Sequence, residues 1–208
     1  FVVPNLKDLK NGIESVKNTR KITKAMQMVA AAKLRRAQDA AEASRPYSER
    51  FNTVLASLAA SVGSSESAPI LLRGTGKQDV HLLIVMTAER GLCGGFNSNI
   101  AKLARSHAAK LKEDGKRVKI ITVGKKGRDA LKRDLGENFV EHVDLSEFKS
   151  IKYINAQSIA QGLLARFDDS EYDVATIFYS KFVNVVSQIP TAQQIIPAIF
   201  DDQSSASD

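Results

Sequence analysis

The segment with the clearest chemical potential is the loop from Glu89 to Asn97, which reads ERGLCGGFN. It follows an apolar run of strand length, Val80–Met86, and precedes a segment with helical periodicity, residues 97–114. Nucleotide-binding folds hold a phosphate at such a strand-to-helix junction. Here the glycine spacing fits neither the dinucleotide fingerprint nor a P-loop, because no Lys-Ser/Thr pair follows the glycines. We therefore predict a tight turn at this junction rather than a phosphate site.

The second candidate for chemistry is Cys93, the only cysteine of the chain. A thiol at a helix N-terminus can be activated as a nucleophile, but no sequence pattern ties His81, His107 or His142 to it. The three histidines are also too scattered to propose a metal site. We therefore expect an inert cysteine, no catalytic residues, no bound metal and no cofactor.

The elements that would position this loop alternate between strand and helix. Further strands are expected at residues 118–123 and 174–178, helices at 97–114, 128–135 and 156–167, and a strand or hairpin broken at Pro190 within residues 182–196. Such alternation indicates a small Rossmann-like α/β domain with a mainly parallel sheet. We place this domain at residues 78–200, after a Ser- and Gly-rich linker at 61–77 and before an acidic, Ser-rich tail at 201–208 that we expect to be disordered.

Residues 1–60 are expected to form one long coiled-coil helix. A 3,4-spaced apolar seam is interrupted by a polar trio and then resumes. Its members are Leu6, Leu9, Ile13, Val16, the trio Arg20, Thr23 and Gln27, then Ala30, Leu34, Ala37, Ala41, Phe51, Leu55 and Leu58. Around Met26 apolar residues occur on every side of the helix, a pattern typical of a helix that is enclosed on all sides.

The charge of the chain is concentrated on this helix. Residues 1–50 hold 11 Lys and Arg against 5 acids, a net charge of +6 out of +7 for the whole chain. Between Lys17 and Arg36 there are seven basic residues and no acid. The pattern predicts an acidic partner surface, because the apolar residues interleaved with the charges argue against a merely solvated basic face. No apolar run approaches the roughly 20 residues of a membrane span, so we expect no direct span.

Several of these segments resemble the gamma subunit of F-type ATP synthase. The matching segments are SVKNTR at 15–20, KITKAMQMVAAA at 21–32, KLRRAQ at 33–38, SRPY at 44–47 and RGLCGGFN at 90–97. The helix motif is the stronger signal, and the similarity runs through nearly the whole chain.

The resemblance implies the central stalk rotor of the synthase, a non-catalytic subunit that couples proton-driven rotation to ATP synthesis or hydrolysis. Its partners would be the hexamer of alpha and beta subunits, the epsilon (or delta-type) stalk subunit and the membrane c-ring. The residues that would contact the hexamer are Arg20, Lys21, Ile22, Lys24, Met26, Val29, Lys33 and Arg36. The complex would lie at the cytoplasmic face of the bacterial plasma membrane, or on the matrix side of the mitochondrial inner membrane.

Two departures and two alternatives accompany this interpretation. The family continues into a second long helix that the printed sequence does not include. The chain has neither the insertion nor the cysteine pair of the chloroplast type, so the bacterial or mitochondrial type is expected.

One alternative is a basic coiled-coil protein that binds nucleic acid, although basic residues interleaved with apolar ones suit a surrounding protein surface better than a DNA groove. The other is a small-ligand α/β enzyme, which would be indicated by nucleotide binding to the isolated chain.

Overall fold

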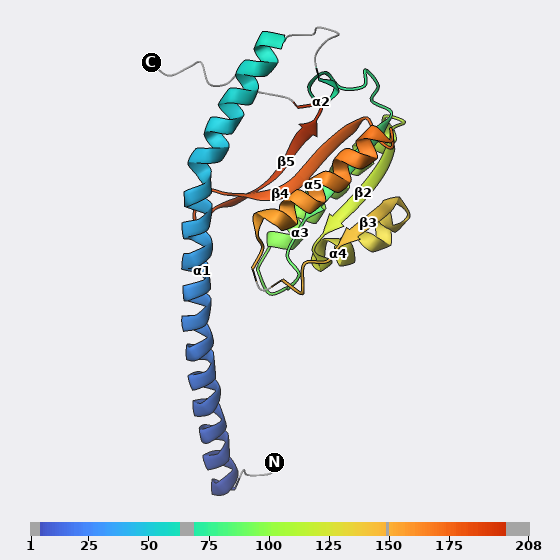
Figure 1. Ribbon diagram of the computed structural model, residues 1–208. Coiled ribbons are helices and arrows are strands. Elements are labelled where there is room, and N and C mark those ends of the chain that lie inside the picture. Colours follow the sequence, from blue (N-terminus) through green and yellow to red (C-terminus); the bar gives the residue numbers. More distant parts are fainter. Residues whose placement is uncertain (1–4, 63–68, 149, 199–208) are drawn as a thin grey trace. The chain divides into compact units, whose positions relative to one another are not determined.

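The computed structural model describes residues 5–62, 69–148 and 150–198, and the side chains of residues 59–62 are not described. The chain divides into two compact units, Phe1–Asn52 and Thr53–Asp208 (Figure 1). The first unit consists of most of one helix, and the second contains all of the sheet. The expected tail at 201–208 and residues 63–68 of the expected linker at 61–77 lie outside the described residues, and the described part of that linker contains the end of the long helix and a short helix at Ile70–Arg73.

Helix α1 spans Leu6–Val62, which is 57 residues or about 85 Å at 1.5 Å per residue. It begins after Asn5, whose side-chain oxygen accepts a hydrogen bond from Lys7 N at 3.3 Å, as an N-cap residue does. Pro46 lies inside the helix without ending it. Every described residue from Asn5 to Ala37 is exposed, which includes the apolar seam as far as Ala37.

The second unit contains a five-stranded sheet with the order β3-β2-β1-β4-β5. Strands β1 (Val80–Met86), β2 (Arg117–Val123), β3 (Phe139–Val143) and β4 (Val174–Phe182) are parallel, and β5 (Gln188–Ile196) is antiparallel to β4. The expected Rossmann-like fold with a mainly parallel sheet is confirmed. The chain leaves β1 toward β2 on one side and later returns to β4 on the other, so the strand order reverses between β1 and β4.

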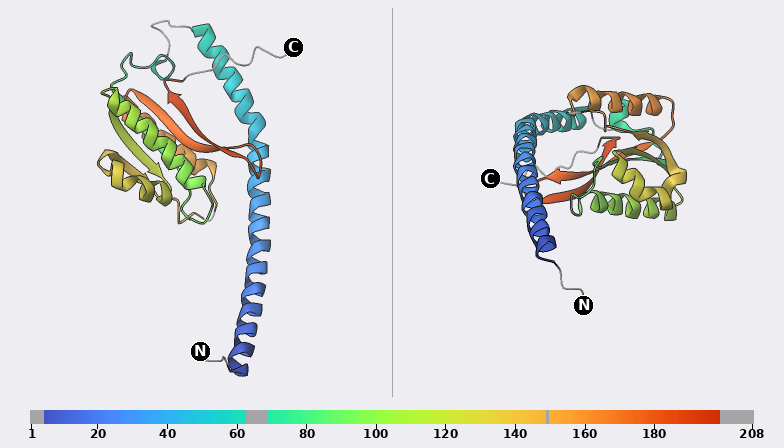
Figure 2. Two further views of the ribbon diagram at one scale, coloured as in Figure 1. Left: turned by 180° about the vertical axis from the view of Figure 1, so that it is seen from behind. Right: turned by 90° about the horizontal axis from the view of Figure 1, so that it is seen from below.

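Helices cover both faces of this sheet (Figure 2). Helices α3 (Phe96–Glu113) and α4 (Lys125–Leu135) pack on one face through a cluster that includes Leu83, Ile100 and Phe178. Helix α5 (Tyr153–Asp168) covers the other face through Leu163 and Phe167. The short helices α2 (Ile70–Arg73) and η1 (Gly136–Asn138) complete the described elements. None of the helices in the described part of the chain is long and apolar enough to cross a membrane.

The structure adds elements that the sequence patterns did not indicate. Strand β3 is an edge strand whose residues are only partly buried, so it lacks the continuous apolar run of β1. Strand β5 runs through Pro190 rather than breaking there. A proline is tolerated in β5 because this strand also lies at an edge of the sheet, where a missing N–H need not interrupt the ladder. Residues 183–196 thus form the turn and the second strand of a hairpin with β4.

Candidate functional site

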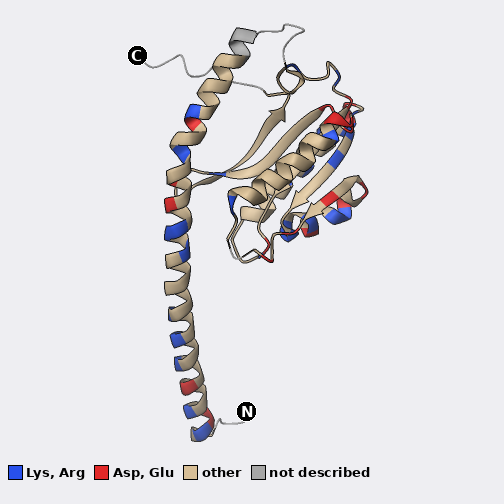
Figure 3. Cartoon of the chain, viewed as in Figure 1, with Lys and Arg blue, Asp and Glu red and all other residues tan. Residues whose placement is uncertain are grey.

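The basic segment of α1, Lys17–Arg36, contains Lys and Arg residues but no acid (Figure 3), and all its residues are exposed to solvent. At about 100° per residue, Ile22, Met26 and Val29 fall on one face of the helix, together with Lys33 and Arg36, within an arc of about 80°. We call these five residues the apolar-basic stripe. The side chains of Ile22, Met26 and Val29 are 61%, 67% and 57% exposed. The helix therefore brings five of the eight predicted contact residues onto one surface.

The other three predicted contact residues lie elsewhere on the same helix. Arg20 and Lys24 are one turn apart on a face roughly opposite the stripe, and Lys21 lies between that face and the stripe. The first part of the coiled-coil seam, from Leu6 to Val16, also lies roughly opposite the angular position of the stripe. Helix α1 thus exposes apolar side chains on two opposite faces, with cations beside both. This arrangement suits a helix that is covered on more than one side.

The cations of this segment have no partners within the described part of the chain. None of the seven basic residues between Lys17 and Arg36 forms an ion pair or a side-chain hydrogen bond there. By contrast, Arg166 of the α/β unit binds Glu141 and Glu171 at 3.0 Å each. The positive charge of α1 is consequently available to an acidic surface of another molecule.

The glycine loop between β1 and α3 is closed by Asn97. The Asn97 side-chain oxygen accepts a hydrogen bond from Ala88 N at 2.9 Å, and its amide nitrogen donates to the Arg90 carbonyl at 3.2 Å and to Cys93 Sγ at 3.0 Å. Gly94 has a φ of +58°, which glycine adopts without strain. Leu92 also has a positive φ, +59°. These contacts make the loop a self-contained turn.

The neighbouring helix N-terminus, that of α4, is also already occupied. Its first three amides bind the end of β1: Lys125 N donates to the Glu89 carboxylate at 3.0 Å, Lys126 N to the Ala88 carbonyl at 3.2 Å, and Gly127 N to the Thr87 hydroxyl at 2.7 Å. A carboxylate therefore occupies an amide position that could otherwise bind an anion. Its charge would repel a phosphate there.

Glu89 also reaches a third loop, because its other carboxylate oxygen accepts a hydrogen bond from Leu145 N at 2.9 Å. One side chain in the β1–α3 loop thus joins the loops that follow β2 and β3. Sequence reasoning included Glu89 and Asn97 in the loop motif but did not identify them as the residues that lock it. The signal was the polar type of both residues at the ends of a glycine-rich turn.

The cysteine and the histidines do not form a common site. Cys93 is exposed, and its sulfur accepts the hydrogen bond from Asn97. Burial lowers the pKa of both His81 and His107, and His107 packs edge-on against Phe178 at a ring-centroid distance of 5.3 Å. His142 Nδ1 lies 2.8 Å from the Thr122 hydroxyl. Within residues 5–62, 69–148 and 150–198, no group of three or more His, Cys, Asp or Glu is placed to hold a metal ion.

These features define an α/β protein that carries a long basic helix with apolar side chains on opposite faces. The family model for ATP synthase matches residues 5–208. The chain is 75% identical over 201 residues to the ATP synthase gamma chain of Roseobacter denitrificans, covering 97% of this chain and 69% of that protein. It is 72% identical over 204 residues to the gamma chain of Ruegeria pomeroyi, covering 98% and 70%. The chain belongs to the ATP synthase gamma-chain family.

A solved structure shares the fold. The central stalk of Tetrahymena thermophila mitochondrial ATP synthase, solved with its c-ring, matches with a TM-score of 0.61 and 24% identity. The match covers 85% of this chain and 72% of that chain. The family resemblance inferred from the helix and loop motifs is confirmed. The roles of the eight predicted contact residues stay predictions.

Proposed function

We propose that this chain is the rotor subunit in the central stalk of a proton-transporting F-type ATP synthase and is not itself catalytic. In this role α1 turns inside the hexamer of alpha and beta subunits. The α/β domain forms the foot that meets the epsilon (or delta-type) subunit and the membrane c-ring. Membership of the gamma-chain family over residues 5–208 supports this assignment. The bacterial relatives favour a position at the cytoplasmic face of the plasma membrane.

The observation that carries the proposal is the distribution of side chains on α1. A helix that rests on one core needs a single apolar face, whereas α1 exposes apolar residues on two opposite faces. The seam that contains Leu9 and Ile13 suits a second helix in a coiled coil. The apolar-basic stripe around Met26 then faces outward, toward the surrounding subunits.

The chemistry of this outward surface suits rotation. Exposed ion pairs contribute only about 0–1 kcal/mol each. Lys33 and Arg36 can therefore exchange acidic partners as α1 turns, and no single angle of rotation is strongly favoured. The asymmetric shaft presents a different surface to each catalytic subunit at each angle. Contacts that differ between conformations shift their populations, and this couples rotation to nucleotide affinity.

A non-catalytic role is supported by the glycine loop. No Lys-Ser/Thr pair follows its glycines, and Glu89 occupies the neighbouring amide position. We therefore expect no ATP hydrolysis by the isolated chain once contaminating catalytic subunits have been removed. The two alternatives, a nucleic-acid-binding coiled coil and a small-ligand enzyme, gain no support from the comparisons.

The test uses Met26, an exposed residue in the middle of the stripe. Met26→Lys replaces the central apolar side chain of the stripe by a cation, and Met26→Leu keeps an apolar side chain of similar volume. Both variants should fold and assemble, since Met26 is not part of a core. In reconstituted membranes, Met26→Lys should lower the ratio of proton pumping to ATP hydrolysis, and Met26→Leu should leave that ratio near the parent value. Equal ratios for the two variants would contradict a role for the stripe in coupling.

A further inference from the structure

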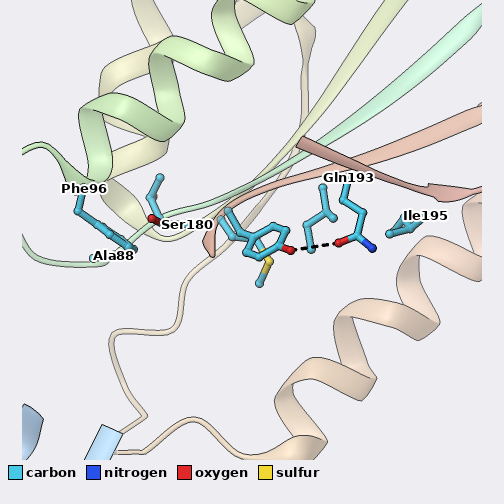
Figure 4. A pocket seen from close by; sticks show the side chains of 9 residues that line it. Ala88, Phe96, Ser180, Gln193 and Ile195 are labelled. Atoms are coloured by element: carbon cyan, nitrogen blue, oxygen red, sulfur yellow. Dashed lines mark hydrogen bonds between the residues drawn. The ribbon is translucent and has the colours of Figure 1, made fainter. Parts of the chain in front are cut away.

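A pocket of about 520 Å³ opens beside the carboxyl ends of β1 and β4 (Figure 4). This is the point at which the strand order reverses, and open α/β sheets bind their ligands in the crevice at that point. The volume lies within the range of about 300–1,000 Å³ that is usual for small-molecule sites. The lining residues are Met86, Thr87, Ala88, Phe96, Ile177, Tyr179, Ser180, Gln193 and Ile195.

The pocket exists because α5 covers only part of its face of the sheet. Leu163 and Phe167 of α5 pack with Leu82 and other buried residues of β1 and β2. Farther along the same face, Ile177 and Ile195 are only partly buried against that cluster. Within the described part of the α/β unit, the carboxyl end of β1 and the adjoining parts of β4 and β5 therefore form an apolar floor that α5 does not cover.

The chemistry of the lining restricts what the pocket can hold. None of the nine lining residues carries a carboxylate, an ammonium or a guanidinium group. Helix α3 begins at the lining residue Phe96, whose amide donates to the Cys93 carbonyl, and the N-terminus of α4 binds Glu89, Ala88 and Thr87 rather than presenting free amides. A phosphate or another anion would thus find no counter-charge, whereas an uncharged apolar molecule would find Met86, Phe96 and the two isoleucines.

Hydrogen-bonding groups at one side of the pocket add a polar requirement. The Tyr179 hydroxyl donates to the Gln193 side-chain oxygen at 3.1 Å. Among the described residues no hydrogen bond occupies the Gln193 amide nitrogen or the Ser180 hydroxyl, so both remain able to donate. The Thr87 hydroxyl, by contrast, already donates to the Gly124 carbonyl at 3.3 Å. A ligand that fits this pocket carries a hydrogen-bond acceptor such as a carbonyl oxygen.

We propose that this pocket is a binding site for an uncharged, mainly apolar molecule with a carbonyl acceptor, which lies on the apolar floor and accepts a hydrogen bond from Gln193. The proposal does not depend on the rotor function, because the pocket is formed by the α/β domain alone. It assigns to this domain a binding capacity separate from any role of α1.

The test uses Nile red, a neutral planar dye with a carbonyl group, and pyrene, a neutral planar molecule without one. The 208-residue chain contains three methionines, Met26 and Met28 on α1 and Met86 in the pocket. With ¹³C-labelled methionine methyl groups, each site reports separately by NMR. Saturable binding of Nile red should shift the Met86 signal and leave those of Met26 and Met28 in place. A missing Met86 shift, or shifts confined to α1, would overturn the proposal.

Two variants locate the contacts. Ser180→Leu fills the pocket and should weaken binding of both probes at least about tenfold, whereas Ser106→Leu, on the exposed side of α3, should have no effect. Gln193→Leu keeps the shape but removes the donor, so Nile red should bind about fivefold more weakly while pyrene is unaffected. Equal weakening of both probes by Gln193→Leu would refute the hydrogen bond. Unchanged binding to a folded Ser180→Leu variant would refute the site.

Discussion

The carboxylate of Asp173 holds together the start of the sheet, and its replacement by Asn offers a sharp test of the described packing. One oxygen accepts hydrogen bonds from Asp79 N and Val80 N at 3.0 Å each, and the other accepts one from the Thr75 hydroxyl at 3.0 Å. Asp173→Asn keeps the shape but replaces one acceptor oxygen by an NH₂ donor. Hydrogen bonds to a charged group contribute about 1.5–3 kcal/mol each. We expect the α/β domain to lose about 2–4 kcal/mol of stability at pH 7.

This loss should depend on pH in a defined direction. Partial burial of Asp173 opposes ionisation, but the hydrogen bonds from Val80, Thr75 and Asp79 outweigh it and hold the pKa of the carboxyl below its usual value. A depressed folded-state pKa gives stability that is fully present above the unfolded value of about 3.9 and is lost as the pH falls through the folded value. The difference between the parent and Asp173→Asn should therefore be full at pH 7 and smaller near pH 3.

The measurement is urea unfolding at both pH values, followed by the NMR methyl signals of Leu83 and Ile84, which are buried in β1. These signals report on the α/β domain rather than on α1. Glu147→Gln is the control, because Glu147 is an exposed carboxylate without a hydrogen bond or ion pair among the described residues. A loss below about 0.5 kcal/mol at pH 7, or a loss of equal size at both pH values, would refute the role assigned to Asp173.

Three further predictions concern single positions. Gly124→Ala should lower the free energy of unfolding by about 2–4 kcal/mol, because a Cβ would lie 2.2 Å from the Thr87 main-chain oxygen and the φ of Gly124 is +92°. The control is Gly162→Ala on the open face of α5, which should be neutral or stabilising in the same unfolding assay. Burial raises the pKa of Tyr172 to about 12, so ultraviolet titration should show one of the four tyrosines ionising at higher pH than the others. Tyr172→Phe should remove that late step and lower the free energy of unfolding by about 1 kcal/mol. The stability that Tyr172 contributes should be lost as the pH rises toward 12, and a normal titration of all four tyrosines would contradict its burial. Cys93→Ser should leave coupled activity near that of the parent, and a large loss without misfolding would make the thiol functional.

The fold was predictable where burial is continuous. Strand β1 is buried along almost its whole length, so its apolar run identified it within the same bounds that the structure shows. Strand β3 escaped prediction because none of its residues is buried, and such an edge strand has a sequence little different from a loop. Pro190 suggested a break for a similar reason, since a sequence does not reveal that its strand lies at an edge.

The candidate site was predictable in its residue types but not in its geometry. The basic and apolar composition of Lys17–Arg36 is visible in the sequence. That Met26 and Lys24 lie on different faces follows only once the segment is known to be one continuous helix. Long-range contacts left no local signal at all. Asp173 and Asp79 are 94 positions apart, and nothing in the residues around either one indicates the other. The same holds for Glu89 and Leu145, which lie 56 positions apart.

The bonds at the carboxyl edge of the sheet explain how a nucleotide-type fold can serve a mechanical role. Glu89 joins the loops after β1, β2 and β3, and Thr87 binds Gly127 across the first two. In nucleotide-binding proteins of this fold class, the corresponding amides are left free for a ligand, so the structure of this edge depends on whether the ligand is bound. Here the Glu89 carboxylate accepts hydrogen bonds from two of these amides, Lys125 N and Leu145 N, so the loops are held together whether or not a ligand is present. In the rotor role proposed here, the domain transmits torque and must not yield under load, and replacing a ligand by a built-in anion would supply that stiffness within the chain itself.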